Sequence, residues 1–357
     1  MSAEKRREGG EEVAGDARDL ATTLDTSTQT EKQQTFKALA KWLRNSGPLL
    51  ALVFLVILGA ILSDTFLTVG NITNVVTRSA FIGIISVGAT FVIVTGQIDL
   101  SVGAMAAFIA SLMIMMINQL AALGWNLSSA IFLGMLAGVV VGVVSGLVNG
   151  LLATVGRIDS FIVTLGTMGI FRALVTFLSN GGTLVLDTKV REAYRPVFYD
   201  SWFNVPIPVW VLAIVVAIGA ITLTRTRFGR YCRAVGSNAE VAHYSAIRVN
   251  QIRVVAFVVQ GFCVALATCL YVPRLGSASF STGLGWELEA ITAVVVGGTA
   301  LRGGTGRVGG SIVGALILSL IGNLLNLQNL ISVYLNGAVQ GVIILAAALL
   351  QRSSKSR

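Results

Sequence analysis

The amino-acid sequence predicts an all-α polytopic membrane protein with about ten transmembrane helices. Three observations predict this class. First, 54% of the 357 residues are hydrophobic. Second, only 12% are charged, whereas a soluble domain carries roughly a quarter. Third, apolar stretches close to the ~20 residues that cross a bilayer follow one another from Pro48 onward. Two of these stretches are short, so eight to eleven crossings fit the pattern.

The N-terminal region differs from the rest of the chain. Residues 1–46 hold as many acidic as basic residues and no apolar run, so they cannot bury enough surface to offset the entropy cost of ordering. We expect 1–46 to be a disordered cytoplasmic tail and 47–357 to be the membrane domain. Within the tail, 36–43 fits an amphipathic helix on the membrane surface, and it fits a linker equally well.

The apolar stretches follow one another along the membrane domain. Those at 80–95 and 287–300 are short and adjoin Gly-rich polar stretches, which is typical of broken or re-entrant helices. The predicted spans, in chain order, are 48–66, 80–95, 101–121, 130–153, 160–179, 207–224, 254–273, 287–300, 308–326 and 330–350.

The basic residues favour one orientation in the membrane. Cytoplasmic loops carry an excess of Lys and Arg, and 225–253 alone holds six Arg residues. We therefore expect this stretch and both termini to be cytoplasmic. The basic residues that fall in the predicted outer loops are Arg78, Lys189, Arg191, Arg195 and Arg274.

Polar side chains interrupt the apolar pattern at membrane depth. Gln97, Asp99 and Ser101 lie between two apolar runs, where an uncompensated carboxylate costs at least ~3 kcal/mol. Either broken helix ends lie beside a translocation path, with Asp99 capping the following helix, or Asp99 is only a cap after a short cytoplasmic turn. Arg172 lies within a span, and we favour a structural pairing of its charge over a solute contact.

The longest polar interruption after the tail is 224–253. Asn238 is a suitable N-cap for a short helix that reaches Ile247, and Gly236 stands just before it. Such a helix at the cytoplasmic surface could dock into a partner. The alternative is a basic loop that only fixes the topology.

Four glycines recur every four residues along one predicted helix, at Gly134, Gly138, Gly142 and Gly146. Small residues at this spacing let two helix backbones approach closely. We expect the ridge to pack inside a tight multi-span core, and a homodimer contact is the alternative.

The residues present argue against several chemistries. Three cysteines and one histidine provide no zinc ligand set, so we expect no metal and no cofactor, and we expect the cysteines to be packing residues. The stretch 304–309 fits G-x-G-x-x-G, but Gly310 stands where a P-loop needs lysine. We expect a tight turn there, and a chain that is not an enzyme and cannot hydrolyse ATP by itself.

Several strings together resemble the permease subunits of ribose-type ABC importers. The most specific is GRYCRAVGSNAEVAHYSAIRV at 229–249, and the others are GQIDLSVGAM at 96–105, FIVTLGTMGIFRAL at 161–174 and WELEAITAVVVGGTALRGGTGRVGGSIVGALI at 286–317. Two departures stand out. Glu240 is displaced by one position from the usual Asn-Glu-Ala order, and Ala246-Ile247 replaces the usual Gly-Ile.

The resemblance implies the protein's function and partners. It implies inward movement of a small, pentose-like or hexose-like sugar through the inner membrane. The implied partners are an ABC ATPase subunit, expected as a fused double ATPase, an extracytoplasmic substrate-binding protein docking on the outer loop 180–206, and a second copy of this chain. It also favours an inverted repeat, with the Thr-Gly stretches at 95–100 and 282–288 in equivalent places. The rival function is an ion-coupled secondary transporter or channel without an ATPase.

Two groups of site residues follow from these patterns and from the resemblance. The group expected to couple to the ATPase lies in the 224–253 loop, and the group expected along the translocation pathway lies at the broken helices and in the 161–174 string. The coupling group is Arg230, Gly236, Asn238, Glu240 and His243, and the pathway group is Gln97, Asp99, Ser101, Phe161, Thr164, Arg172, Glu287 and Glu289.

Overall fold

A computed structural model describes residues 47–328, 337–338 and 341–342. The chain divides into two compact units, 1–50 and 51–357, and the arrangement below concerns the second unit. The predicted tail, its 36–43 segment and the last predicted span, 330–350, lie outside the described residues.

Seven helices in the described residues are long and apolar enough to cross a membrane. This count is below the ten that the sequence predicts. Two further predicted spans correspond to shorter helices, the apolar helix Gly47–Leu62 and α12 (Trp286–Val296). The seven long helices are α2 (Val69–Val94), α3 (Val102–Ala122), α4 (Leu127–Thr154), α5 (Ser160–Leu178), α8 (Ile207–Arg225), α11 (Val249–Leu275) and α13 (Val308–Gln328).

The prediction of a short span at 80–95 is wrong. Helix α2 is 26 residues long and begins at Val69, where the side chain of Thr68 caps it by accepting from the Asn71 amide. Its first turns carry Asn71, Asn74, Thr77 and Arg78, which line a cavity described below. Hydropathy alone could not separate a cavity-facing helix end from a loop. The other expected break is confirmed, since α12 has only 11 residues.

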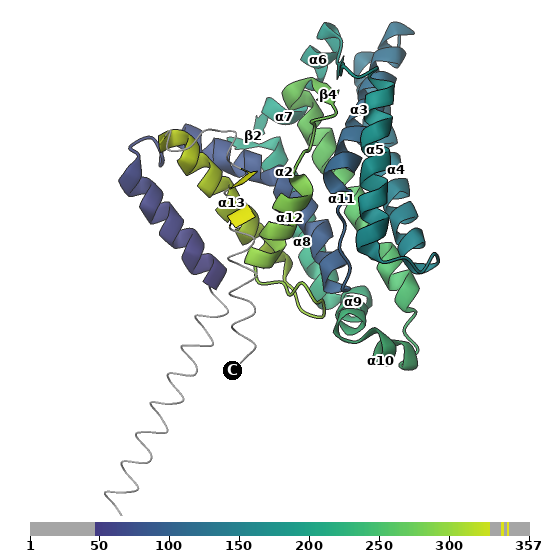
Figure 1. Cartoon of the computed structure of the whole chain (residues 1–357). Helices are drawn as coiled ribbons and strands as arrows, with labels where there is room; N and C mark the ends of the chain where they lie inside the picture. Colours follow the sequence, from purple (N-terminus) through teal and green to yellow (C-terminus); the bar gives the residue numbers. More distant parts are fainter. Residues whose placement is uncertain (1–46, 329–336, 339–340, 343–357) are drawn as a thin grey trace, which may run out of the picture. The chain divides into compact units, whose positions relative to one another are not determined.

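Short elements gather at two opposite ends of the long helices (Figure 1). At the first end are α6 and α7 and two small antiparallel pairings, β1 with β4 and β2 with β3. At the second end are α9 and α10. Their bounds are β1 Thr183–Val185, α6 Thr188–Tyr194, α7 Pro196–Tyr199, β2 Ser201–Trp202, β3 Val205–Pro206, α9 Arg227–Ser237, α10 Ala239–Tyr244 and β4 Ser277–Ser279.

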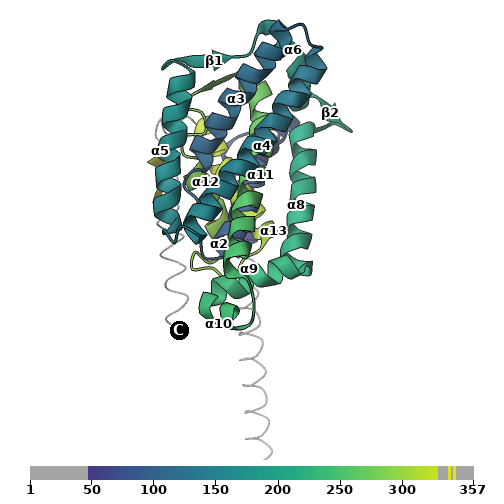
Figure 2. The ribbon, with the colours of Figure 1, turned by 90° about the vertical axis from the view of Figure 1, so that its right-hand side faces the viewer.

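Helix α2 lies at the centre of the packing. Its residues from Ser79 to Val94 are all buried, and it contacts α8, α11, α12 and α13. Helices α3, α4 and α5 lie side by side (Figure 2) and contact one another. Apolar side chains on the outer faces of α4, α5 and α8, such as Phe132, Ile162 and Ile218, are exposed. In a membrane protein such faces meet lipid rather than water.

The glycine ridge of α4 packs inside the chain, so the preferred interpretation is confirmed. A Cβ atom at Gly142 would lie 2.5 Å from the carbonyl oxygen of Gly261, and one at Gly146 would lie 2.2 Å from that of Phe257. Only glycine allows α4 and α11 to approach this closely. Gly134 and Gly138 face side chains of α3 instead, those of Ile117 and Met113. The ridge is therefore occupied and does not form a homodimer contact.

Two connections enter the helix bundle and bring two helix starts together. Residues 95–101 link α2 to α3, and 280–285 link β4 to α12. A Cβ atom at Gly103, in the first turn of α3, would lie 2.0 Å from the Gly283 carbonyl oxygen and 2.5 Å from Glu287 Oε2. The first turns of α3 and α12 thus meet. This geometry agrees with the predicted broken helices, while the inverted repeat stays a prediction.

A linked series of cavities and a capped surface helix

Three cavities with shared walls line the molecule from the α6 end inward. The outer cavity, about 370 Å³, lies beside α6, α7 and the end of α11. The middle cavity, about 560 Å³, adds the start of α2 and the end of α13. The inner cavity, about 280 Å³, reaches α12. Arg274 lines all three cavities, and Arg78 and Asn326 line the middle and inner ones. The three cavities therefore adjoin one another through shared lining residues.

A buried tyrosine joins α6 to α11, two of the helices that line the outer cavity. The Tyr194 hydroxyl of α6 donates to the carbonyl oxygen of Cys269 in α11 at 2.8 Å. Burial raises the pKa of Tyr194 well above its usual value, so this hydroxyl stays protonated and remains a donor. Arg191, Glu192 and Arg195 project from the same short helix and its end into the cavity.

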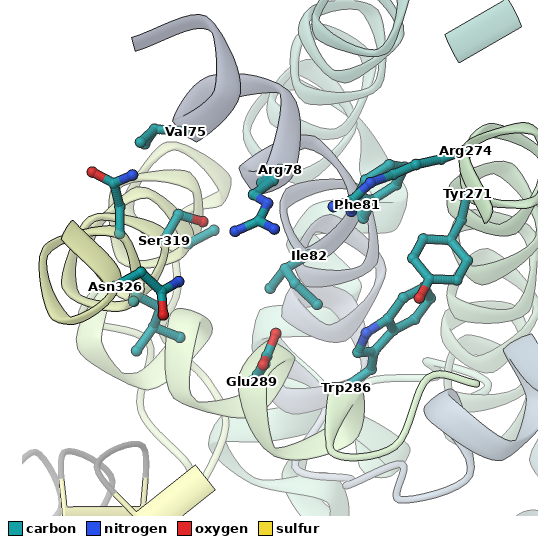
Figure 3. Close-up of a pocket in the computed structure, with 14 residues that line it drawn as sticks. Val75, Arg78, Phe81, Ile82, Tyr271, Arg274, Trp286, Glu289, Ser319 and Asn326 are labelled. Atoms are coloured by element: carbon teal, nitrogen blue, oxygen red, sulfur yellow. The ribbon is translucent and has the colours of Figure 1, made fainter. Parts of the chain in front are cut away.

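The inner cavity has two unlike walls (Figure 3). Tyr271 and Trp286 lie on one side, and Ser319 and Asn326 of α13 lie on the other. The side chains of Arg78 and Glu289 point into the space between them. A cavity lined by aromatic rings and a few convergent polar groups is typical of small-molecule sites.

Aromatic rings continue from the inner cavity toward α7. Trp286 meets Tyr271 edge to face, with ring centroids 4.8 Å apart, and Tyr271 meets Phe81 in the same way at 5.4 Å. Phe81 stacks on Phe198 at 5.8 Å. The Arg274 guanidinium lies over both Phe81 and Phe198, at 5.9 and 5.8 Å. We call these four rings the aromatic wall.

Of the two glutamates of α12 assigned to the pathway, Glu289 lines the inner cavity and Glu287 lines none of the three described cavities. Glu287 points elsewhere, because residues two apart lie about 200° apart around a helix. Its Oε2 atom lies against Gly103 at the start of α3 and has no hydrogen-bond partner among the described residues.

Asp99 and Ser101 form a buried network beside this junction. Asp99 Oδ1 accepts from the Ser101 amide at 2.9 Å and from the Ser101 hydroxyl at 2.6 Å. Asn149 of α4 donates to the same hydroxyl at 2.8 Å. Asp99 thus binds Ser101, the N-cap residue of α3, and accepts from no amide of the helix itself, so the expected direct cap is not formed. Gln97 is half-buried and donates to the adjacent Gly96 carbonyl oxygen at 3.1 Å.

Arg172 pairs with backbone carbonyls rather than lining a cavity. It donates to Phe280 O and, at 2.7 Å, to Thr282 O, and its guanidinium lies 5.5 Å from the Phe280 ring. This arrangement holds the connection before α12, in agreement with the structural pairing that we favoured. On the same helix, Thr164 is buried and donates to Ser160 O at 2.8 Å, while Phe161 is half exposed.

Several cavity residues were not identified from the sequence. Arg78 and Arg274 were placed in outer loops, but they lie within α2 and α11. Ser319, Asn323 and Asn326 were not singled out, although their spacing gave a usable signal. Positions three or four apart share a helix face, so polar residues at 319, 323 and 326 form one stripe on an otherwise apolar helix.

The predicted surface helix is present as α10. Asn238 Oδ1 accepts from the amides of Glu240 and Val241, both at 3.0 Å, which confirms it as the N-cap. The side chains of Glu240, Val241 and His243 are exposed. Arg230, on the preceding helix α9, is also exposed and donates to Arg225 O at 3.4 Å. Helix α9 itself was not predicted.

Gly236 faces inward, unlike the rest of the coupling group. A Cβ atom there would lie 1.8 Å from Val94 O and 2.5 Å from the Gly304 amide nitrogen. The Gly304 amide also donates to Val94 O at 2.9 Å. The end of α9, the end of α2 and the turn between α12 and α13 therefore meet through backbone atoms. The expected turn lies just before the 304–309 stretch, where the Gly303 amide donates to Ala300 O at 2.9 Å, and Val308 and Gly309 already belong to α13.

Comparisons with known proteins agree with this geometry. Residues 71–348 match the family model described as branched-chain amino acid transport system / permease component. The chain is 35% identical to the ribose import permease protein RbsC of Escherichia coli K12, over 92% of this chain and 100% of the relative. It is 39% identical to RbsC of Bacillus subtilis, over 87% and 93%. It is 32% identical to the L-arabinose transport system permease AraH of E. coli, over 86% and 90%. No solved structure matches the chain.

Proposed function

The chain belongs to this family of transport-system permease components, and from this premise we propose that it is the membrane-spanning permease of an ATP-driven importer for a small sugar. The observation that carries the proposal is the similarity to ribose import permeases over the full length of the relative. The arabinose permease supports the same class of solute.

The ATP hydrolysis that drives the importer belongs to a separate subunit in this proposal. Helix α10 is exposed and rigidly capped, so it suits a groove in an ATPase subunit, with Arg230, Glu240 and His243 at the contact and Asn238 holding the helix start. Packing in such a groove transmits rigid-body movement, and charges orient the two surfaces. Gly236 then passes the movement to α2 and to the turn after α12.

The remaining partners and the orientation are also part of the proposal. Two copies of this chain would engage a fused double ATPase at the α10 end, which faces the cytoplasm with both termini. An extracytoplasmic substrate-binding protein would dock on residues 180–206, where Arg191, Glu192 and Arg195 surround the outer cavity. Mixed charges suit a transient polar interface of this kind.

We divide the pathway residues by what they contact. Glu289 is the one that lines the adjoining cavities, and we place it on the solute path. Asp99, Ser101, Glu287 and Arg172 hold the junction between the starts of α3 and α12. The other three pathway residues, Gln97, Phe161 and Thr164, line none of the three cavities.

Reconstitution tests the proposal. Proteoliposomes containing the permease with its ATPase should take up radiolabelled ribose only when both the binding protein and ATP are present. Uptake that persists without ATP and follows a proton gradient would instead support the ion-coupled alternative.

Variants in the coupling surface test the role of α10. His243→Ala and Glu240→Ala remove exposed side chains, so the permease should still fold but should bind the ATPase more weakly. Sugar-stimulated ATP hydrolysis should fall several-fold in these variants. Ser129→Ala, an exposed change in the first turn of α4 and outside both proposed partner surfaces, is the matched control and should leave it unchanged.

A further inference from the structure

We propose that the inner cavity is a sugar-binding site within the permease itself, formed by the aromatic wall on one side and the polar stripe of α13 on the other. This inference rests on the proposed function and identifies the residues that would select the solute. The cavity is bounded by α2, α11, α12 and α13.

The aromatic wall matches one part of a sugar. The two faces of a sugar ring carry C–H groups and are apolar, so they pack against flat aromatic rings. Trp286 and Tyr271 both line the cavity (Figure 3), and because their ring planes are 84° apart, one of the two can lie flat against a given sugar face. Phe81 and Phe198 continue the wall toward α7, and Phe198 lines the adjoining middle cavity.

The opposite wall matches the other part of a sugar, its hydroxyl edge. Ser319 and Asn326 both donate and accept hydrogen bonds, as hydroxyl groups do. Asn323 of the same stripe exchanges two hydrogen bonds with Asn71 of α2, at 3.1 and 2.7 Å. That pairing fixes the position of the stripe relative to α2.

Two charged groups lie between the walls. Arg78 points into the cavity from α2, and Glu289 points into it from α12 (Figure 3). A guanidinium donates to sugar hydroxyl oxygens and a carboxylate accepts from hydroxyl hydrogens, and both bonds are stronger than those between neutral groups. The site therefore offers apolar packing to the ring face and charged partners to its edge.

The same geometry disfavours a branched-chain amino acid, the solute class in the family model's description. Arg78 and Glu289 could hold its charged groups. Its aliphatic side chain, however, would offer no hydrogen bond to Ser319 or Asn326, whereas the hydroxyl edge of a sugar would. The polar stripe thus distinguishes a sugar from an amino acid.

Binding to the permease alone tests the inference. The full-length chain in lipid nanodiscs, without binding protein or ATPase, should bind tritiated ribose in a scintillation proximity assay. Unlabelled arabinose should displace ribose, and leucine should not. Trp286→Leu and Asn326→Leu should each weaken binding by at least about tenfold, while Trp286→Phe keeps a flat ring and should stay within about threefold.

A matched change controls for general damage. Trp125 lies in the connection between α3 and α4, is 50% exposed and lines none of the three cavities. Trp125→Leu should bind ribose as the unaltered chain does. All variants should elute as a single species in size-exclusion chromatography, and Asn326 is exposed, so its substitution is compatible with folding.

The outcomes separate this inference from the proposed function. If the complete importer takes up no sugar, the proposed function fails. If the complete importer transports ribose but the permease alone binds none, or binds it equally well in Trp286→Leu and Asn326→Leu, the inference fails and the proposed function stands. Displacement of ribose by leucine would also overturn the inference.

Discussion

Ala246 has a backbone conformation that L-amino acids rarely adopt. It follows α10 with a φ of 60°, at the position where the resembled permeases usually have glycine. A residue with a Cβ atom is less stable than glycine in this left-handed conformation by roughly 1–2 kcal/mol. The exposed side chain of Ala246 contributes little to packing, so the strain is not offset there.

We therefore expect Ala246→Gly to stabilise the protein by about 0.5–1 kcal/mol, because the greater freedom of glycine in the unfolded chain offsets part of the relief. A thermal-unfolding assay in detergent measures the change. The matched control is Ala239→Gly, in the first turn of α10, where glycine should destabilise the helix. A lower unfolding temperature for Ala246→Gly than for the unaltered protein would contradict the inference that Ala246 is strained.

Cys232 shows how firmly α9 is packed. Its side chain is fully buried in a cluster with Phe91 and Val94 of α2 and Leu223 of α8. Burial raises the pKa of the Cys232 thiol to about 12. The reactive thiolate is therefore scarce at neutral pH and becomes abundant only as the pH approaches that value.

A maleimide should consequently fail to label Cys232 in the folded protein at pH 7 and at pH 9, and should label it after denaturation in SDS. Intact-mass spectrometry of a variant with Cys263→Ser and Cys269→Ser measures the modification. Ser237→Cys in the same background, at an exposed position on α9, is the positive control. Rapid labelling of native Cys232 would show that α9 separates readily from α2.

At the scale of elements, α12 is distinctive because it connects the two functional regions. Its first turn carries Trp286 and Glu289 of the inner cavity. Its last turn leads to the turn that meets Gly236 of α9. Gly285 precedes the helix with a φ of 84°, and Gly298 follows it with a φ of 91°. We expect this short helix to move about these two glycines during transport.

Restricting these two glycines tests the movement. A Cβ atom at Gly285 or Gly298 meets nothing within 4 Å, so Gly285→Ala and Gly298→Ala change backbone freedom without a clash. Each should lower ATP-dependent ribose uptake several-fold while the ATPase still binds. Gly124→Ala is the control. Gly124 lies between α3 and α4 with a φ of 82°, and a Cβ atom there also meets nothing within 4 Å. The variant therefore has the same backbone cost, and the importer that contains it should transport ribose normally. Equal losses in all three variants would contradict the role of α12.

At the scale of the whole molecule, the prediction concerns orientation. Residues 225–253, from the last residue of α8 to the first turns of α11, hold six Arg residues, and the excess of basic residues in cytoplasmic loops predicts that this stretch lies inside. In a chain without its native cysteines, a membrane-impermeant maleimide should label Ser201→Cys on intact cells. It should label Ser237→Cys only after lysis. The reverse pattern would exclude α10 as a site for a cytoplasmic ATPase.

The predictable part of this protein is the part that depends on local sequence. Most helices follow from apolar runs of membrane length, and α10 follows from Asn238 before a helix-compatible stretch, because capping and burial in lipid act within a few residues. Asp99 was recognised because a carboxylate between apolar runs needs partners. Its actual partners, Ser101 and Asn149, include one from another helix.

Only the tertiary structure decided the composition of the cavities. Arg78, Arg274, Glu289 and Asn326 come from four helices and meet around one space. Hydropathy reports whether a residue suits a membrane helix, but it does not report which helix faces it. Arg78 and Arg274 were accordingly placed in loops, because a charged residue near the end of an apolar stretch is expected to be exposed to solvent. The sequence does not show that a neighbouring helix encloses such a residue in a cavity. The sequence by itself therefore determined the class and most of the long helices, and long-range packing determined the site.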